Sequence, residues 1–419
     1  MSRKQSLALI ITILLIVGGI WLVTTSHPAV WPIRNNLQYQ SLTWLWAIIG
    51  EPQQGQPGNL AGTVTDQHDE PLAEAWILLS RWDGTTYQAQ TDEQGRYQIE
   101  AIPAGQYQPV ASASNYNHRL AQLVTIEAEQ TTMLPLRLTA RTPPAVTPAQ
   151  AFSLSEPSRL TCTKPFVSSA DRRQIHFDNA GQPNQLTFYY TPVTATTKLP
   201  LILVIYPGPV DSWECASISL SAGEFSVLAV GPPYSFVVEE QLDELERLID
   251  LAQEDAFPLG DGRRVGLLGG SFSSIHVLRI IQRRQDVQAA LLLGPPTDMF
   301  AMRNHLENGT FIPPFGLDQI MIAAGFPDRE MMRYWQYSAA YHVRSDFPPL
   351  AILHSRSDEV VPIEQSERLA ANLAAVGAVH ETHFFDGAGH YLMAADSDAD
   401  TAEVYRITID FLTRYLGQN

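Results

Sequence analysis

The chain has 419 residues, a net charge of −17 and a pI near 5.0. Binding to the phosphates of a nucleic acid requires a basic face, so this charge disfavours nucleic acid as a partner. The length is sufficient for two hydrophobic cores, and we therefore expect more than one domain.

The first 26 residues have the pattern of a transmembrane anchor. Arg3 and Lys4 precede a nearly continuous apolar run from Leu7 to Val23. As a helix this run would be about 26 Å long, close to the roughly 30 Å of a bilayer's hydrocarbon core. A cleavable signal peptide is the alternative, but the run exceeds the usual apolar length and no A-x-A site follows. We expect a single-pass membrane protein with a cytoplasmic N-terminus and the bulk of the chain extracytoplasmic.

Residues 27–58 are predicted to be a juxtamembrane segment and linker. The apolar stretch from Leu42 to Ile49 is too short to span a bilayer but contains two tryptophans, which is typical of segments at a membrane interface. Packing of this stretch on the protein itself is the alternative. Residues 51–58 are polar without periodicity, as expected of a linker.

Residues 59–140 contain short alternating runs separated by turn signals such as Asp83-Gly84, a pattern that predicts a small antiparallel β-sandwich. The segment resembles carboxypeptidase regulatory-like domains, which implies a non-catalytic domain that stabilises or spaces. Surface contact with a carbohydrate or protein through an exposed Trp82 or Tyr116 is a second hypothesis. The motifs that carry the resemblance are Gly62-x-Val64-x-Asp66, Pro71-Leu72-x-x-Ala75, Thr91-Asp92-x-x-Gly95-x-Tyr97-x-Ile99 and Ile102-Pro103-Ala104-Gly105-x-Tyr107. Residues 141–160 are predicted to be a proline-rich, stiff linker to a second domain at 161–419.

A strand–turn–helix pattern in the second domain marks a candidate nucleophile. An apolar run ends at Leu268, a glycine pair precedes Ser271, and apolar residues with helical spacing run from Ile275 to Ile281. Ser271 would project from the carboxyl edge of a sheet, beside a helix N-terminus that favours negative charge. The G-x-S-x-G pattern keeps Gly269 but ends in Ser273, which is small enough for close packing of helix on strand.

A serine hydroxyl needs a base to remove its proton and an anion to orient that base. Asp358 lies in the turn after an apolar strand predicted to begin at Leu350, and His390 lies in a glycine-containing loop after a strand predicted to begin at Thr382. The order Ser, Asp, His, each at a strand end, matches that of α/β-hydrolases. Asp298 is the rival for the acid, because some hydrolases place the carboxylate one strand earlier.

From about residue 174 to the C-terminus the sequence resembles α/β-hydrolases of the dienelactone-hydrolase and prolyl-oligopeptidase-like branches. The residues that carry the resemblance are the Ser271 turn, Asp358 before Val361-Pro362, and Gly387-x-Gly389-His390. It implies an α/β fold with a doubly wound, mostly parallel sheet. It also implies that Ser271 is the nucleophile, Asp358 the acid and His390 the base. An insertion at about 295–345, rich in Met, Phe, Tyr and Trp, is predicted to be a helical cap, and its composition favours an apolar or acyl-bearing substrate group.

An oxyanion hole requires donors beside the nucleophile. The N–H of Phe272 is the first candidate, by the geometry of such serine turns. The second donor would come from the loop after the strand at 201–205, where two prolines lack an N–H. The candidates there are the Tyr206 hydroxyl and the N–H groups of Gly208 and Val210, with Tyr206 and Gly208 ranked equally.

The expected function is that of a membrane-anchored serine hydrolase that cleaves carboxylic esters through an acyl-enzyme. A serine peptidase of prolyl-oligopeptidase-like type is the alternative, and a non-catalytic surface protein with a degenerate hydrolase fold is the third hypothesis. The substrate would be a small molecule or peptide with an acyl group. The histidines other than His390 are interpreted as packing or surface residues (His276, His305, His342, His354 and His383). They lack short-spaced ligand partners, so no metal or cofactor is expected. Cys162 and Cys215 would form one disulfide only if the fold brings them together.

Overall fold

The computed structural model describes residues 30–51, 55–141, 152–177, 187–232, 238–314, 317–394 and 398–417. The predicted anchor between Leu7 and Val23 lies outside these residues. The chain divides into two compact units. The first contains the residues up to Thr139 together with Arg303–Met332, and the second contains Ala140–Met302 and the residues from Arg333 onward.

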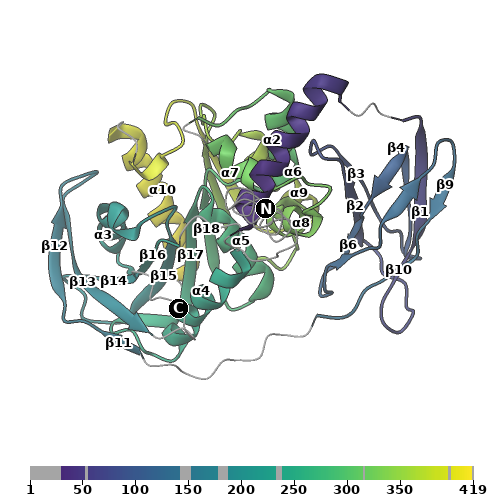
Figure 1. Ribbon diagram of the computed structural model, residues 1–419. Coiled ribbons are helices and arrows are strands. Elements are labelled where there is room, and N and C mark those ends of the chain that lie inside the picture. Colours follow the sequence, from purple (N-terminus) through teal and green to yellow (C-terminus); the bar gives the residue numbers. More distant parts are fainter. Residues whose placement is uncertain are drawn as a thin grey trace, which may run out of the picture. The chain divides into compact units, whose positions relative to one another are not determined.

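The first unit contains the predicted β-sandwich (Figure 1). One sheet has the order β10-β1-β4, with β9 also paired to β1, and a second sheet has the order β3-β2-β6-β7. The strands are β1 (Pro57–Thr65), β2 (Trp76–Ser80), β3 (Thr86–Gln90), β4 (Arg96–Pro103), β6 (Val110–Ser112), β7 (Arg119–Leu120), β9 (Thr131–Met133) and β10 (Leu136–Arg137). A further pair joins β5 (Gly105–Tyr107) to β8 (Val124–Ile126).

Alternating side chains of the sandwich strands form its core. Leu60 and Val64 on β1 are fully buried, and the hydroxyl of Tyr97 on β4 donates to the Leu134 carbonyl oxygen at 2.6 Å. Position 62 on β1 requires glycine, because a Cβ there would lie 2.1 Å from the Leu134 carbonyl oxygen. The expectation of a wholly antiparallel sandwich is wrong in one respect, because β9 and β10 pair with β1 in parallel.

Residues expected to form only a juxtamembrane segment contain a helix, α2 (Trp31–Ile49), which packs on α7 (Leu317–Ala323) within the first unit. Pro32 occupies the first turn, where its missing N–H leaves no helical hydrogen bond unmade. The helix ends at Gly50, whose φ of 85° a side chain would strain. Within the ranges that the structure describes, no helix combines the length and apolarity needed to cross a bilayer.

The second unit is built on a single sheet of ten strands with the order β11-β13-β14-β16-β15-β17-β18-β19-β20, and with β12 paired to β13. Its first strands pair antiparallel, and β16, β15 and β17 to β20 pair in parallel. The strands are β11 (Phe152–Leu154), β12 (Ser158–Cys162), β13 (Ser168–Phe177), β14 (Thr187–Pro192), β15 (Leu199–Ile205), β16 (Ser226–Val230), β17 (Gly260–Gly270), β18 (Ala289–Leu293), β19 (Leu350–Ser355) and β20 (His380–Phe385). This order confirms the predicted α/β-hydrolase sheet. The prediction of a linker as far as residue 160 is wrong at its end, because β11 and β12 already belong to the sheet.

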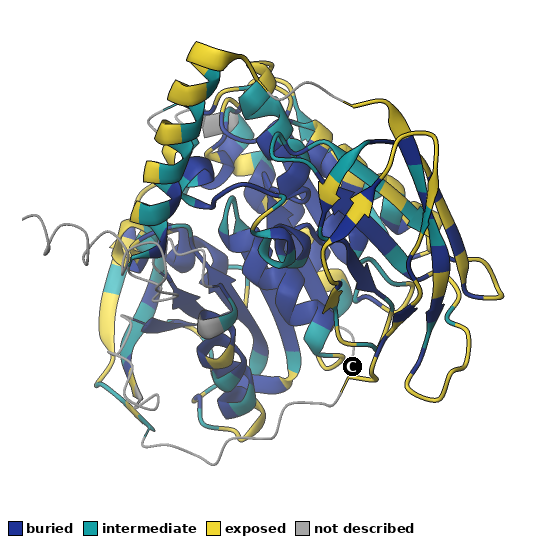
Figure 2. Ribbon diagram, turned by 45° about the vertical axis from the view of Figure 1, so that its right-hand side comes forward, coloured by how far each residue is buried: buried dark blue, intermediate teal, exposed yellow. Residues whose placement is uncertain are grey.

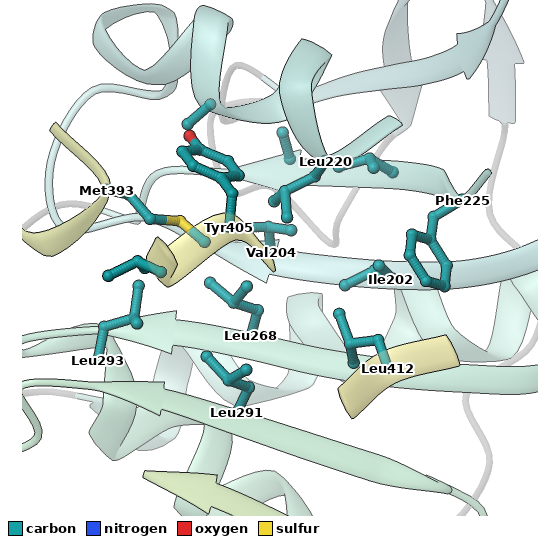
Figure 3. Packing of buried hydrophobic residues seen from close by; sticks show 14 of the residues in the cluster. Ile202, Val204, Leu220, Phe225, Leu268, Leu291, Leu293, Met393, Tyr405 and Leu412 are labelled. Atoms are coloured by element: carbon teal, nitrogen blue, oxygen red, sulfur yellow. The ribbon is translucent and has the colours of Figure 1, made fainter. Parts of the chain in front are cut away.

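Helices cover both faces of the central parallel strands. On one face lie α3 (Glu214–Ser221) and α10 (Asp398–Leu416), and on the other lie α4 (Val238–Gln253) and α5 (Ser273–Arg283). Figure 3 shows Tyr405 and Leu412 of α10 against Val204, Leu268 and Leu291 from neighbouring strands. These strands are buried on both faces, which explains their continuous apolar runs.

Between β18 and β19 the chain forms α6 (Met299–Asn308), α7 and α8 (Met331–Tyr337), as expected of a helical insertion. The middle of this insertion, Arg303–Met332, packs with the first unit rather than with the hydrolase sheet. Its buried Arg303 donates to the Met321 carbonyl oxygen at 3.0 Å and lies over the ring of Tyr39 on α2. The sequence did not reveal this association, because the insertion is far from α2 along the chain.

Cys162 on β12 and Cys215 on α3 form a disulfide, with their Cα atoms 5.5 Å apart. The sequence left this pairing open. The bond joins a strand near the edge of the sheet to a helix on its face, so it crosslinks two elements in the N-terminal part of the second unit.

Candidate active site

The candidate nucleophile lies at the corner where β17 ends and α5 begins. Ser271 has a φ of 53°, and its N–H donates to the Leu293 carbonyl oxygen at 2.7 Å. This left-handed conformation is costly for a residue with a side chain, and such strain is common at catalytic turns. Gly269 is required, since a Cβ there would lie 2.7 Å from Val277 and 2.8 Å from the Ser273 carbonyl oxygen. Ser273 is the first residue of α5, so ordinary helical angles suit a serine at the second glycine position of the motif.

The three predicted residues meet at the carboxyl ends of their strands. The Ser271 hydroxyl lies 2.8 Å from His390 Nε2, and His390 Nδ1 lies 2.7 Å from Asp358 Oδ2. The donors in this order are the serine O–H and the imidazole Nδ1–H, because an ionised carboxylate can only accept. The residue before the base, Gly389, has a φ of 62°, which directs the loop after β20 back toward β17.

Asp358 is buried and accepts four hydrogen bonds. Val360 N–H and Val361 N–H both donate to Oδ1 at 2.8 Å, and His390 and His354 lie at Oδ2. Burial alone would raise the pKa of Asp358, but the hydrogen bonds from His354, His390 and the Val361 N–H lower it well below its usual range. The carboxylate is therefore ionised at neutral pH.

His354 is a contact of this site that the sequence analysis interpreted as packing. Its Nε2 lies 3.0 Å from the Val361 carbonyl oxygen and 3.1 Å from Asp358 Oδ2, and its Nδ1 lies 2.6 Å from Ser366 Oγ. A carbonyl oxygen only accepts, so Nε2 carries the proton and is shared between the two oxygens, while Nδ1 accepts from the Ser366 hydroxyl. The signal in the sequence was its place four residues before the acid, at the end of β19.

Gly294 is a second site residue that the sequence analysis missed. It follows β18 with a φ of 52°, and a Cβ there would lie 3.1 Å from Asp358 Oδ2 and 3.5 Å from the His390 ring. A side chain would crowd the contact between acid and base. A glycine after a buried strand was the available signal.

The rival acid, Asp298, has structural partners instead. Its Oδ1 accepts from the Ala301 N–H at 3.0 Å at the start of α6, and its Oδ2 accepts from the Tyr341 hydroxyl at 3.0 Å. Arg368 also forms an ion pair with Oδ2. These contacts occupy both oxygens, so the geometry favours Asp358 as the partner of His390.

The candidate oxyanion donors differ in their surroundings. Phe272 directly follows Ser271 at the start of α5. The hydroxyl of Tyr206 is buried, lies 3.0 Å from Ser217 Oγ, and its ring stacks on Trp213 at 5.2 Å. Burial raises the pKa of Tyr206 well above its usual value. Gly208 has a φ of 93° in the loop after β15. Because the Tyr206 hydroxyl already pairs with Ser217, we expect Gly208 rather than Tyr206 to be the second donor.

The other histidines have structural partners. His276 Nε2 lies 2.7 Å from Gln241 Oε1, and His342 Nε2 lies 2.8 Å from the Trp335 carbonyl oxygen. Burial lowers the pKa of His276 to about 4 and that of His342 to about 3, so both are neutral at pH 7. Among the described residues, no cluster of His, Cys, Asp and Glu has an arrangement that would hold a metal ion.

Two parts of the chain match known families. Residues 59–139 match the carboxypeptidase regulatory-like domain, and residues 241–419 match the prolyl oligopeptidase family. The second segment contains Ser271, Asp358 and His390. Residues 241–419 are therefore similar to a family of serine hydrolases. The predicted resemblance is confirmed for both parts of the chain.

Relatives of this serine hydrolase are distant. It is 25% identical over 213 residues to the uncharacterized peptidase YuxL of Bacillus subtilis (strain 168), covering 47% of this chain and 31% of the relative. The chain thus spans about a third of the length of that curated relative.

Several solved structures are similar to the hydrolase in fold. A carbohydrate esterase from gut microbiota is 18% identical, with a TM-score of 0.48, and the match covers 62% of this chain and 97% of that one. Esterase 2 of Thermogutta terrifontis is 14% identical, with a TM-score of 0.47 and coverage of 58% and 95%. An acetyl ester-xyloside bifunctional hydrolase from Caldicellulosiruptor lactoaceticus is 17% identical, with a TM-score of 0.45 and coverage of 57% and 91%. TM-scores below 0.5 carry no argument about the substrate.

Neither aromatic residue named for surface contact on the sandwich is exposed. Trp82 is partly buried, with its ring 4.4 Å from that of Trp46 on α2, and Tyr116 packs against the sandwich core. Both therefore have a packing role in the first unit. A carbohydrate or protein contact through these two side chains finds no support here.

Proposed function

We propose that this chain is a membrane-anchored, extracytoplasmic carboxylic ester hydrolase with Ser271, His390 and Asp358 as its catalytic triad. The observation that carries the proposal is the continuous path from the Ser271 hydroxyl to His390 at 2.8 Å and from His390 to Asp358 at 2.7 Å. Both distances are within the range of direct hydrogen bonds. A serine with this pair of neighbours is activated as a nucleophile.

The reaction follows from the roles of these atoms. His390 Nε2 takes the proton of Ser271 as Oγ attacks the ester carbonyl carbon. The N–H groups of Phe272 and Gly208 bind the resulting oxyanion, and Asp358 stabilises the imidazolium. The imidazolium then gives its proton to the departing alkoxide, which leaves an acyl-enzyme on Ser271. A water molecule, deprotonated by His390, attacks this acyl group and releases the carboxylic acid.

Ester hydrolysis ranks before peptide hydrolysis because an alkoxide can leave the tetrahedral intermediate without prior protonation, whereas the nitrogen of a peptide bond must be protonated before it leaves. Peptide cleavage is the second candidate, and it is favoured by the match to the prolyl oligopeptidase family and by the name of the relative from Bacillus subtilis.

Two observations support the extracytoplasmic, membrane-bound location. The disulfide between Cys162 and Cys215 is of a kind that persists in oxidising compartments and is rare in the cytosol. The apolar run from Leu7 to Val23 follows two basic residues, as in segments whose N-terminus stays cytoplasmic.

A fluorophosphonate probe tests the triad directly, because it reacts with an activated serine. The wild type should be labelled at Ser271, and the Ser271→Ala variant should not. A control variant at an exposed serine on β12, Ser158→Ala, should be labelled like the wild type. A folded wild type that is not labelled would favour the non-catalytic hypothesis. Rates on p-nitrophenyl esters of increasing chain length, compared with peptide anilides, then distinguish esterase from peptidase.

A further inference from the structure

One side of α2 exposes large apolar side chains to solvent. In Figure 2, exposed and partly buried residues alternate along this helix. Its large exposed apolar residues include Ile33 at 56%, Leu37 at 51%, Trp44 at 68% and Ile48 at 61%. At about 100° per residue these four positions fall within about 60° of one another around the helix axis. We refer to these four side chains as the outer stripe.

The opposite side of α2 already has a partner. Trp31 Nε1 donates to Glu330 Oε1 at 2.9 Å, and Asn35 Nδ2 donates to the Ala323 carbonyl oxygen at 3.0 Å. The ring of Tyr39 lies 5.7 Å from that of Phe326. These contacts fix the rotation of α2 on the first unit, so the outer stripe cannot turn inward without breaking them.

A surface helix of a soluble protein normally has a charged or polar outward face, and a helix that is apolar all round is normally covered on all sides. The 19 residues of α2 include one charged residue, Arg34, which pairs with Glu330 at 3.3 Å. No charge therefore lies on the outer stripe to keep it in water. The helix also contains uncharged polar residues, such as Gln40 and Ser41, but the large side chains of its outer stripe are apolar and exposed.

The sequence before α2 indicates what covers this side. The apolar run that ends at Val23 lies eight residues before Trp31, a separation of at most about 28 Å even in a fully extended chain. A chain anchored by this run therefore holds the start of α2 close to the bilayer surface. Trp44 in the outer stripe is the side chain typical of the boundary between lipid and water.

We infer that α2 lies along the membrane interface, with the outer stripe inserted at the boundary between headgroups and acyl chains. This inference rests on the membrane anchor of the proposed function. The uncharged stripe needs no anionic lipid, so a zwitterionic bilayer is sufficient. The opposite side of α2 then attaches the first unit to the membrane surface through Trp31, Asn35 and Tyr39.

The test uses the full chain in phosphatidylcholine vesicles, with and without doxyl-labelled lipid as a quencher. Single cysteines at Trp44→Cys and Ile48→Cys receive an environment-sensitive NBD label. Val167→Cys, 77% exposed in the second unit, is the matched control. No free cysteine lies in the described part of the chain, so the disulfide does not compete for the label. The labels at 44 and 48 should shift to the blue and be quenched at least threefold more strongly than the label at 167.

Labels at 44 and 48 that are as exposed to water as the label at 167 would overturn the inference. Flotation of the same vesicles separates the two failures. A chain that floats with the vesicles while its α2 labels face water contradicts the interfacial helix alone, whereas a chain that does not float contradicts the anchor and this inference together. Labels that are shielded but not quenched by lipid would show that a protein surface, such as a second copy, covers the stripe instead. Unchanged ester hydrolysis by each variant verifies that it is folded.

Discussion

Replacement of His354 examines how the acid of the triad is held. His354→Leu removes the Nε2–H shared by Asp358 Oδ2 and the Val361 carbonyl oxygen, and it leaves the Ser366 hydroxyl without its acceptor. His354→Gln is the matched variant, because its amide can still donate toward Asp358 from a similar position. Neither leucine nor glutamine titrates, so the difference in stability and kcat between the two variants reports on the hydrogen bond to the Asp358 carboxylate.

The magnitude follows from the charge of the acceptor. A hydrogen bond to an ionised group contributes about 1.5–3 kcal/mol, which corresponds to about 1–2 pKa units for Asp358. The free energy of unfolding at pH 7 should therefore be about 1.5–3 kcal/mol lower for His354→Leu than for His354→Gln. The kcat of the leucine variant should fall about tenfold if the carboxylate tilts enough to raise the barrier by about 1.4 kcal/mol.

The pH dependence distinguishes this role from packing. The pKa of Asp358 is depressed in the folded state, so its contribution to stability is present above the unfolded pKa of about 3.9. That contribution is lost as the pH falls through the folded pKa. The unfolded pKa is the same for both variants and cancels from their difference, so the gap depends only on the two folded pKa values of Asp358. Urea denaturation should show a constant gap from pH 7 to about pH 4, which narrows only as the pH falls through the folded pKa of the leucine variant. A gap that is absent at pH 7 or already lost above about pH 4, or a leucine variant with wild-type kcat, would refute the reasoning.

Three further predictions concern the rest of the site and the fold. Asp358→Asn should lower kcat by about 10³–10⁴-fold, as loss of the triad acid does elsewhere. Asp298→Asn should change kcat by less than about tenfold and lower mainly the thermal stability. Equal losses of kcat in the two variants would contradict the assignment of the acid. Tyr206→Phe should leave kcat within about threefold of the wild type. Gly208→Ala should lower kcat by at least about 10²-fold, because a Cβ at a φ of 93° would displace the N–H that donates to the oxyanion. The opposite order in steady-state kinetics would assign the second oxyanion donor to Tyr206. Replacing both Cys162 and Cys215 by serine should lower the free energy of unfolding by about 4 kcal/mol, because the disulfide closes a loop with a sequence separation of 53 and so lowers the entropy of the unfolded chain. A loss below about 1 kcal/mol in denaturant titration would contradict this entropic contribution.

The sequence predicted the catalytic half of the fold well because parallel strands with two buried faces have long apolar runs. The residues that follow such strands meet at one edge of the sheet, so Ser271, Asp358 and His390 were predicted from their order at strand ends, their flanking motifs and the resemblance to α/β-hydrolases. The turn at Ser271 was equally clear, because the close approach of Val277 and Ser273 requires a glycine at position 269.

Other parts depended on contacts that a sequence pattern does not encode. Apolar residues on both sides of α2 gave no helical periodicity, so this segment was not predicted as a helix. The disulfide depended on the approach of β12 to α3. His354 resembled any buried histidine at the end of a strand, and its contact with Asp358 is set by the turn between them. The choice between Tyr206 and Gly208 required the Ser217 hydroxyl, which lies eleven residues after Tyr206.

The division of the insertion between β18 and β19 affects how the protein can be dissected. A fragment that begins at the hydrolase sheet would contain residues 303–332 without the helix on which they pack. Gly325 would lose its neighbour Asn35, and Arg303 would lose the ring of Tyr39 beneath its guanidinium. Such a fragment would expose side chains that α2 covers in the full chain and would tend to aggregate, so biochemical work on the hydrolase should retain the chain from residue 30 onward.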